Sequence, residues 1–264
     1  NHDGTFRDAS RQALRHTSQA SMGTDIADFN NDGLLDVISL DMLPEDHKRR
    51  MSHIGVGPIY SPTYDSTQMT RNVLQLNLGN GHFTDIGQLA GIAETDWSWA
   101  ALFEDFDNDG NKDLYITNGY KRDVSNLDVT FNMQRTRMDP VTMYRSIPTT
   151  RLQNYVFRNN GDLTFSKHNT QWGITQVINS NGAVVCDLDR DGDLDIVTNN
   201  IDSVAFLYRN NASQFSLGRY LRIALHGKAP NTEGIGARIE LWANGSYQLR
   251  EAYRNRGYLS SVEP

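Results

Sequence analysis

Three nine-residue segments carry oxygen-bearing side chains at alternate positions. The central one, residues 105–113, reads Asp-Phe-Asp-Asn-Asp-Gly-Asn-Lys-Asp, with aspartates at positions 1, 3, 5 and 9 and a glycine at position 6. The pattern returns at 28–36 and 187–195. Calcium takes roughly six to eight oxygen ligands from carboxylates, amides and backbone carbonyls. Each segment is therefore predicted to form a calcium loop, with about three ions in total.

The predicted ligands are positions 1, 3, 5, 7 and 9 of each loop. Glycine at position 6 allows the positive φ that turns the chain around the ion, and position 7 offers its backbone carbonyl, so its side chain varies. A solvated acidic turn is the alternative, which the threefold repetition disfavours. The ligands are Asp28, Asn30, Asp32, Leu34, Asp36, Asp105, Asp107, Asp109, Asn111, Asp113, Asp187, Asp189, Asp191, Asp193 and Asp195.

The segments around these loops predict strands and exclude an EF-hand. An EF-hand needs a glutamate at position 12, where this chain has Ser39, Ile116 and Thr198. The flanking residues are short and apolar, as in β-strands, and lack the pattern of amphipathic helices. Each loop is therefore expected to join two strands of a hairpin.

A longer repeat contains the loops. A phenylalanine precedes each loop by the same offset, at Phe6, Phe83 and Phe165, and follows a glycine-containing turn. Further strands are expected at 73–77, 155–159 and 206–210, and others are expected to start near Phe6, Phe83, Phe165 and Phe215. Each unit then has four strands, which is typical of a β-propeller blade.

The repeated loop pattern resembles the FG-GAP or VCBS repeats of integrin-like β-propellers over residues 1–217. From residue 218 the chain resembles the start of an ASPIC/UnbV domain, with Gly234-Ile-Gly and Arg256-Gly-Tyr-Leu-Ser-Ser. The order of these parts is similar to that in large VCBS-repeat proteins of Bacteroidetes. That resemblance implies a surface or secreted binding protein.

The predicted fold class is all-β: a partial β-propeller of three to four four-stranded blades with calcium loops and helical insertions, followed by a small β domain at 218–264. Three units are too few for a ring, since propellers use about four to eight blades. Blades upstream, partner copies and an open arc are the alternatives. Upstream blades are favoured.

Two insertions, 42–72 and 119–153, separate the second and third strands of the first two units. Hairpins of an up-and-down blade alternate between its two ends, so the insertions should lie opposite the calcium loops, where long loops often bind ligands. Packing of the tryptophans between blades and a solvated basic helix face are the alternatives. The candidate ligand-binding residues are His47, Arg49, Tyr60, Tyr64, Trp97, Trp99, Tyr120 and Arg122.

Composition narrows the partners. Of 32 acidic residues, 12 lie in the three loops, so three calcium ions would change the formal charge from -7 to -1. The chain has no stripe of basic residues, so nucleic-acid binding is not predicted. No apolar run is long enough to span a membrane. The single cysteine, Cys186, cannot form an internal disulfide.

The sequence thus predicts a non-enzymatic, calcium-binding scaffold that binds a glycan or a surface protein through the insertion face. Loops of this kind fill where calcium is millimolar, so the expected location is extracellular, at the cell surface or periplasmic. A propeller-based polysaccharide lyase is the alternative function, and a structural spacer is a third. A lyase would need a base beside a cation, and no such arrangement stands out.

Overall fold

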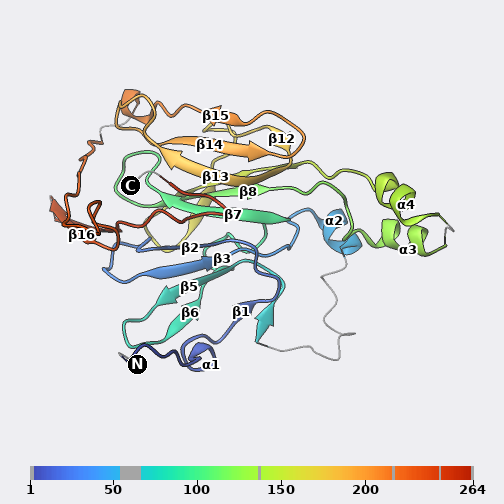
Figure 1. The fold of residues 1–264 in the computed structure, drawn as a ribbon, viewed down its shortest axis with the longest axis horizontal. Coiled ribbons are helices and arrows are strands. Elements are labelled where there is room, and N and C mark those ends of the chain that lie inside the picture. Colours follow the sequence, from blue (N-terminus) through green and yellow to red (C-terminus); the bar gives the residue numbers. More distant parts are fainter. Residues whose placement is uncertain (1–2, 54–66, 136–137, 216–217, 244, 263–264) are drawn as a thin grey trace.

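The computed structural model describes residues 3–53, 67–135, 138–215, 218–243 and 245–262. Three antiparallel sheets follow one another along the chain and stack beside each other (Figure 1). We call them blades 1, 2 and 3. Blade 1 contains β2 (Thr24–Ala27), β3 (Asp36–Ser39), β5 (Val73–Asn77) and β6 (Phe83–Asp85). Blade 2 contains β7 (Ser98–Glu104), β8 (Asp113–Asn118), β10 (Tyr155–Asn159) and β11 (Phe165–Lys167). Blade 3 contains β13 (Ser180–Cys186), β14 (Asp195–Asn200) and β15 (Phe206–Tyr208).

The mostly-β, propeller-like architecture is confirmed, and blades 1 and 2 have the four up-and-down strands predicted. Blade 3 has three strands in the described part of the chain. The fourth strand does not begin at Phe215 itself, and residues 216–217 lie outside the described residues. After β15 the chain enters the short helix η3 (Ala212–Gln214), and Phe215 is 88% exposed. Phe165, which begins β11, instead packs against Phe29 and Phe103. No blade among the described residues covers Phe215. Phe6 is fully exposed and begins no strand either.

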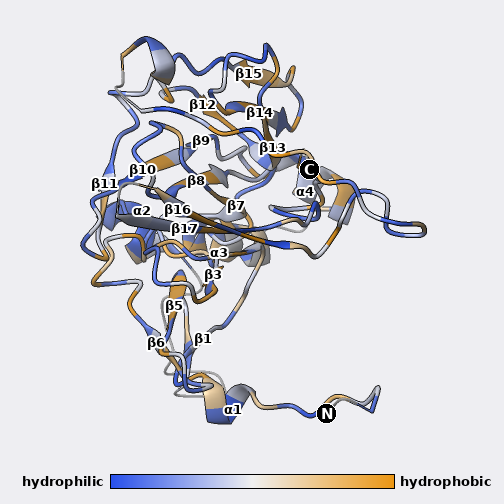
Figure 2. Ribbon diagram, turned by 90° about the vertical axis from the view of Figure 1, so that its left-hand side faces the viewer, coloured by the Kyte–Doolittle hydropathy of each residue, from blue (hydrophilic) through white to orange (hydrophobic). Residues whose placement is uncertain are grey.

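Strand β7 is buried on both faces. Side chains alternate between the faces of a strand. Ala101 and Phe103 enter the core shared with blade 1, whereas Ala100 and Leu102 enter the core shared with blade 3. Its sequence is therefore a continuous apolar run rather than a polar alternation. Figure 2 shows such hydrophobic residues concentrated in the strands, for example in β5 and β10.

The second residue of each acidic loop shows which blades have a neighbour. Phe29 and Phe106 are buried, whereas Leu188 is 50% exposed. The side-chain amide of Asn159 donates to the carbonyl of Phe29 (2.9 Å), and that of Asn210 donates to the carbonyl of Phe106 (2.7 Å). Each blade thus covers the loop of the blade before it. No blade within the described residues covers Leu188.

The segments between the second and third strands of blades 1 and 2 contain helices. These are α2 (His47–Ser52), α3 (Leu127–Arg135) and α4 (Pro140–Ser146). Asp139 caps α4 by accepting from the N–H groups of Val141 and Thr142 (3.1 and 3.0 Å), and Pro140 occupies its first turn, as predicted. Figure 1 shows the three helices at one end of the sheets.

Smaller elements complete the described structure. Helix α1 (Ser10–Ala13) precedes blade 1. The parallel pair β1 (Thr17–Ser18) and β4 (Gln68–Met69) and the antiparallel pair β9 (Leu152–Gln153) and β12 (Val177–Ile178) lie beside the blades. None of the described helices has the length and hydropathy needed to cross a membrane.

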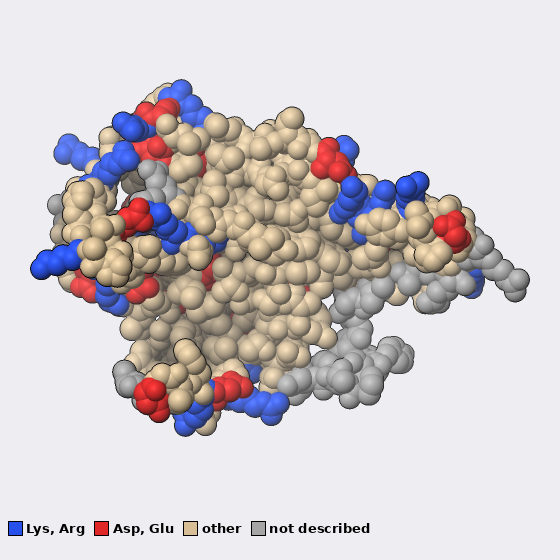
Figure 3. All heavy atoms as spheres, viewed as in Figure 1, with Lys and Arg blue, Asp and Glu red and all other residues tan. Residues whose placement is uncertain are grey.

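The C-terminal part folds back onto the blades. Strands β16 (Arg238–Ala243) and β17 (Ser246–Glu251) form a hairpin at the end opposite the helices (Figure 1). Residues 252–262 then run along the first strands of the blades. We call this side of the blades the inner edge. Gly257 forms a bridge with Thr24, and Val262 enters the core between blades 2 and 3. In Figure 3, charged side chains gather at both ends of the molecule and leave the middle of this face nearly free of them.

Candidate metal centres

The three acidic loops, which we number 1 (28–36), 2 (105–113) and 3 (187–195), share one backbone conformation. Each connects the first two strands of a blade. Positive φ angles recur at position 4 and position 6 of every loop, and the glycine at position 6 adopts the predicted conformation. The φ angles are +60° for Asn31, +57° for Asn108, +63° for Arg190, +86° for Gly33, +92° for Gly110 and +91° for Gly192.

The ninth residue of each loop is held by backbone amides. Asp113 accepts hydrogen bonds from the N–H groups of Phe106 (2.9 Å) and Asn159 (2.8 Å). Asp36 and Asp195 accept the equivalent pairs. Each of these aspartates therefore ties the start of its loop to the third strand of its blade. Its role as a metal ligand stays a prediction.

Positions 1, 3 and 5 bring their carboxylates together in loops 2 and 3. One oxygen each of Asp105, Asp107 and Asp109 lie within 4.8 Å of one another, and the same holds for positions 1, 3 and 5 of loop 3. Oδ1 of Asp107 is buried without a hydrogen-bond partner. A buried carboxylate oxygen without a partner is costly unless a cation or donor satisfies it. The loop thus fits a hard cation.

Loop 1 follows the same plan with an amide in place of one carboxylate. Asp28 accepts from the N–H groups of Asp32 (3.0 Å) and Gly33 (2.9 Å). Asn30 donates from its amide nitrogen to Asp32 (2.9 Å). Its donor set of two carboxylates and one amide oxygen at positions 1, 3 and 5 also suits calcium.

Burial raises the pKa values of several loop carboxyls. The pKa of Asp36 rises to about 7, that of Asp105 to about 6 and that of Asp113 to about 8, and that of Asp28 is also raised. Desolvation is the largest cause, and neighbouring carboxylates in the same loop add to it. A bound divalent cation would reverse this effect by stabilising the ionised form.

An arginine pairs with carboxylates of loops 2 and 3, whereas none of the described arginines forms such an ion pair in loop 1. Arg158, next to the end of β10, contacts Asp107 and Asp109 through two nitrogens, each 2.6 Å from a carboxylate oxygen. Arg209 contacts positions 3 and 5 of loop 3 at 2.6 and 3.6 Å. Blade 1 has Leu76 at this position. The two arginines partly neutralise the loops with the most carboxylates.

The loops are also joined to one another across the blades. Asn31 donates to the carbonyl of Gly110 (2.9 Å), and Asn108 donates to Asp193 (2.8 Å). Lys112 donates to the carbonyl at position 1 of loop 1 (2.7 Å). Hydrogen bonds thus connect each loop to the next one.

The C-terminal segment lies against the glycine of every loop. A Cβ atom added there would meet side chains from residues 218–251, in addition to the strain that its positive φ imposes, and the clash would be severe only at Gly192. The closest distances would be 3.3 Å between Gly33 and Tyr247, 2.9 Å between Gly110 and Gln248, and 2.0 Å between Gly192 and Tyr220.

A buried ion network occupies the inner edge. Arg256 donates to Asp25 (2.6 and 3.0 Å), to Glu104 and to the carbonyl of Phe103 (2.7 Å). Arg250 reaches Glu104 from the exposed side (2.7 and 3.0 Å). Burial opposes ionisation of Glu104, but the two arginines outweigh it and lower its pKa to about 2. The sequence analysis missed this network because its members are more than 140 residues apart along the chain.

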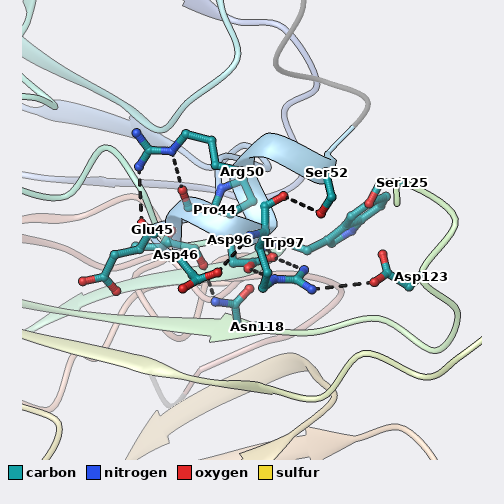
Figure 4. Close-up of polar contacts among 12 residues, drawn as sticks. Pro44, Glu45, Asp46, Arg50, Ser52, Asp96, Trp97, Asn118, Asp123 and Ser125 are labelled. Atoms are coloured by element: carbon teal, nitrogen blue, oxygen red, sulfur yellow. Dashed lines mark hydrogen bonds and ion pairs between the residues drawn. The ribbon is translucent and has the colours of Figure 1, made fainter. Parts of the chain in front are cut away.

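At the opposite end of the blades, three of the predicted ligand-binding residues lie close together. Arg49 of α2 forms a bidentate ion pair with Asp96 (2.6 and 2.9 Å). Trp97 stacks on Tyr120 with ring centres 4.1 Å apart, and the hydroxyl of Tyr120 donates to Asp123. Figure 4 shows Asp96, Trp97 and Asp123 beneath α2. The role of these three residues in ligand binding stays a prediction.

The other predicted residues lie apart. His47 is exposed at the start of α2. Trp99 donates to the carbonyl of Gly119 (2.5 Å), and its ring packs on Tyr258 at 4.9 Å. Arg122 donates to the carbonyl of Ile147 (2.8 Å) and covers the Tyr144 ring. Tyr60 and Tyr64 lie outside the described residues.

A cavity of about 420 Å³ lies beside Arg49. Acidic, amide and apolar residues line it, and the sequence analysis did not select several of them. Asn118 could have been found by aligning the repeats, because it stands five residues after the last aspartate of loop 2, as Asn200 does after loop 3. The lining residues are Glu45, Asp46, Arg49, Asp96, Asn118, Leu152, Gln153 and Tyr155.

Two protein families match the chain. Residues 63–116 and 146–198 match the FG-GAP-like repeat, and residues 227–264 match the family described as ASPIC and UnbV. FG-GAP repeats are typical of extracellular, integrin-like β-propeller proteins. The matched segments include loops 2 and 3, whereas loop 1 precedes them and shares their backbone. No curated protein matches the chain.

Proposed function

The chain belongs to the FG-GAP repeat proteins that carry an ASPIC and UnbV domain, and on this basis we propose that it is a calcium-stabilised extracellular binding scaffold. Its ligand is a glycan or a protein at the insertion face. Its location is the cell surface, the periplasm or the surrounding medium, where calcium is abundant enough to fill such loops.

The observation that carries the calcium proposal is the arrangement of Asp105, Asp107 and Asp109. Three carboxylates converge within 4.8 Å, and one buried oxygen of Asp107 has no partner. Oxygen donors in this arrangement suit calcium better than the softer metals that prefer sulfur or imidazole. Bound calcium would cross-link the first hairpin of each blade and lower the repulsion among its carboxylates.

The state of the tyrosines favours binding over catalysis. A lyase would need a base such as a deprotonated tyrosine near its substrate. Burial raises the pKa of Tyr120 to about 12 and also raises that of Tyr155. Their hydroxyls donate to Asp123 and to Glu45, which holds the protons in place. These contacts support a non-enzymatic role for the described part of the insertion face.

The test is a screen of immobilised glycans and surface proteins with the purified chain, in calcium and in EDTA. We expect binding in calcium that weakens in EDTA, because loops and blades are joined by hydrogen bonds. Parallel assays should detect no unsaturated product from uronic polysaccharides. Calcium-independent product release would instead support the lyase, and the absence of any ligand in both conditions would contradict the scaffold.

A further inference from the structure

The C-terminal part of the chain is attached to the blades in two different ways. Residues 250–262 hold the inner edge through Arg250 and Arg256, which pair with buried carboxylates. Strand β16 and the start of β17 instead contact loops 1 and 2. The first attachment is made by paired charges of the protein itself. The second depends on the conformation of loops that fit a metal ion.

Two side chains of the β16–β17 hairpin contact Gly33, the glycine of loop 1. Arg238 donates to its carbonyl oxygen (3.0 Å) and to the hydroxyl of Tyr247 (3.3 Å). The ring of Tyr247 lies 3.3 Å from the point that a Cβ atom of Gly33 would occupy. In loop 2 the equivalent carbonyl, that of Gly110, accepts from Asn31 of loop 1 (2.9 Å). The hairpin thus supplies to loop 1 the donor that loop 2 receives from a neighbouring blade.

The same glycine is held from the other side by a predicted calcium ligand. The carboxylate of Asp28 accepts from the N–H groups of Asp32 (3.0 Å) and Gly33 (2.9 Å). The carbonyl of Leu34, the next residue, is itself a predicted ligand. Without a cation the carboxylates of positions 1 and 5 repel each other, and the loop loosens. Gly33 then loses the fixed conformation that the hairpin contacts.

From these contacts we infer that calcium in loop 1 controls the docking of the β16–β17 hairpin, while residues 252–262 stay on the inner edge whether or not calcium is bound. A two-stranded hairpin by itself is only marginally stable in water. Loss of the ion therefore lets the hairpin leave loop 1 and fray. Because binding and docking are linked, the docked hairpin tightens calcium binding at loop 1 by the same factor. The inference rests on the proposed calcium binding and adds a conformational response to it.

The test is hydrogen exchange of the whole chain, followed by mass spectrometry, in calcium and in EDTA. Peptides from β16 and β17 should exchange about tenfold faster in EDTA, whereas residues 254–262 should change by less than about twofold. Calorimetry on the same protein shows whether calcium binds. Bound calcium with unchanged hairpin exchange would overturn the inference and leave the calcium proposal intact, and the absence of calcium binding would overturn both. Equal acceleration in the two sets of peptides would show that the C-terminal part responds as one unit, against the inference.

Loop variants identify the loop that controls the hairpin. Asp32→Ala removes a ligand of loop 1, so the hairpin should exchange in calcium as fast as the native chain does in EDTA. Asp191→Ala removes the ligand at the same position of loop 3 and is the matched control, in which hairpin exchange in calcium should stay slow. Equal acceleration in both variants would overturn the assignment to loop 1.

The reciprocal effect is measured on calcium affinity. A double variant, Asp107→Ala with Asp191→Ala, removes ligands of loops 2 and 3, so that calorimetry reports on loop 1. In this background Arg238→Met should weaken calcium binding about fivefold or more, the scale of coupling between linked sites. Arg254→Met is the control, because Arg254 pairs with Glu233 within the C-terminal part (2.6 Å), and it should leave the affinity within about twofold. Unchanged affinity in Arg238→Met would overturn the inference.

Discussion

Glu104 and Asp105 are neighbours in the sequence, yet the protein shifts their pKa values in opposite directions. At the inner edge, Arg250 and Arg256 lower the pKa of Glu104 to about 2 despite its complete burial. In loop 2, burial raises the pKa of Asp105 to about 6, with a contribution from two nearby carboxylates. The inner edge supplies its own cations, whereas the loop concentrates carboxylates that only an external cation can fully compensate. Buried acids are thus structural in one region and poised for a metal in the other.

The largest effect is expected from removing the cation of the inner edge. Arg256→Met leaves Asp25 and Glu104, both almost fully buried, without their shared partner. Breaking a buried ion pair from one side costs about 3–5 kcal/mol. We expect a loss of this size in the free energy of unfolding, measured by chemical denaturation in calcium.

Arg250→Met is the matched control, because Arg250 contacts the same Glu104 but is half exposed. It should cost about 1 kcal/mol or less. Equal losses for the two variants would show that burial does not distinguish the two arginines. A loss for Arg256→Met that calcium restores would contradict the separation between the inner edge and the loops.

The next effect is expected from calcium itself. Each loop filled at a hundred times its Kd adds about 2.7 kcal/mol to the free energy of unfolding. Calorimetry should count three ions per chain, and Asp107→Ala should remove one of them. Asp162→Asn, which changes an exposed carboxylate outside the loops, should still bind three. A denaturation midpoint that is the same in EDTA and in calcium would contradict the metal assignment.

The loops and the blades could be predicted because their signals are local. Alternating aspartates, a glycine and an apolar run define each loop and its two strands within about twenty residues. At Phe215 the same local signal, a phenylalanine in the repeated position, does not begin a strand, because the chain there leaves the short helix η3 in a turn. Phe165 is buried by aromatic residues of blades 1 and 2, and Phe215 lacks such partners among the described residues.

The contacts of the C-terminal part could not be predicted from the sequence. Tyr247 lies on Gly33 and Arg256 binds Asp25, across more than 200 residues of chain. No periodicity encodes such a pairing, and an arginine or a tyrosine in a coil segment is ordinarily exposed. The boundary predicted at residues 217 and 218 therefore separates two stretches of sequence that are packed closely together in space.

A smaller effect is expected from the arginine that distinguishes loop 2 from loop 1. Arg158 pairs with Asp107 and Asp109, where blade 1 has Leu76. Arg158→Leu removes a cation that competes with calcium, and partly exposed ion pairs of this kind are worth about 0.2–1 kcal/mol each. We expect loop 2 to bind calcium about threefold to tenfold more tightly, measured by calorimetry.

The reverse change sharpens this comparison. Leu76→Arg should weaken binding at loop 1 while loops 2 and 3 keep their affinities. Arg71→Leu is a control for the loss of charge in Arg158→Leu. It removes a partly buried arginine of blade 1 that pairs with Asp85 outside the loops. Weaker calcium binding in Arg158→Leu would show that the arginine orients the carboxylates instead of competing for them.

The smallest effect extends the comparison to a buried base. Burial lowers the pKa of His53 from its ordinary value of 6.5, the same cause that raises the pKa of the loop carboxyls. Asp96, Asp123 and Asp41 favour its protonation and Arg49 opposes it, and burial prevails. Below about pH 6.5 the unfolded chain takes up a proton at His53 that the folded chain resists, so the contribution of this histidine to the free energy of unfolding should fall as the pH falls. His53→Gln should flatten this dependence in denaturation curves between pH 7 and pH 5, whereas His47→Gln, at an exposed site, should not. An equal flattening in both variants would show that burial does not govern this histidine.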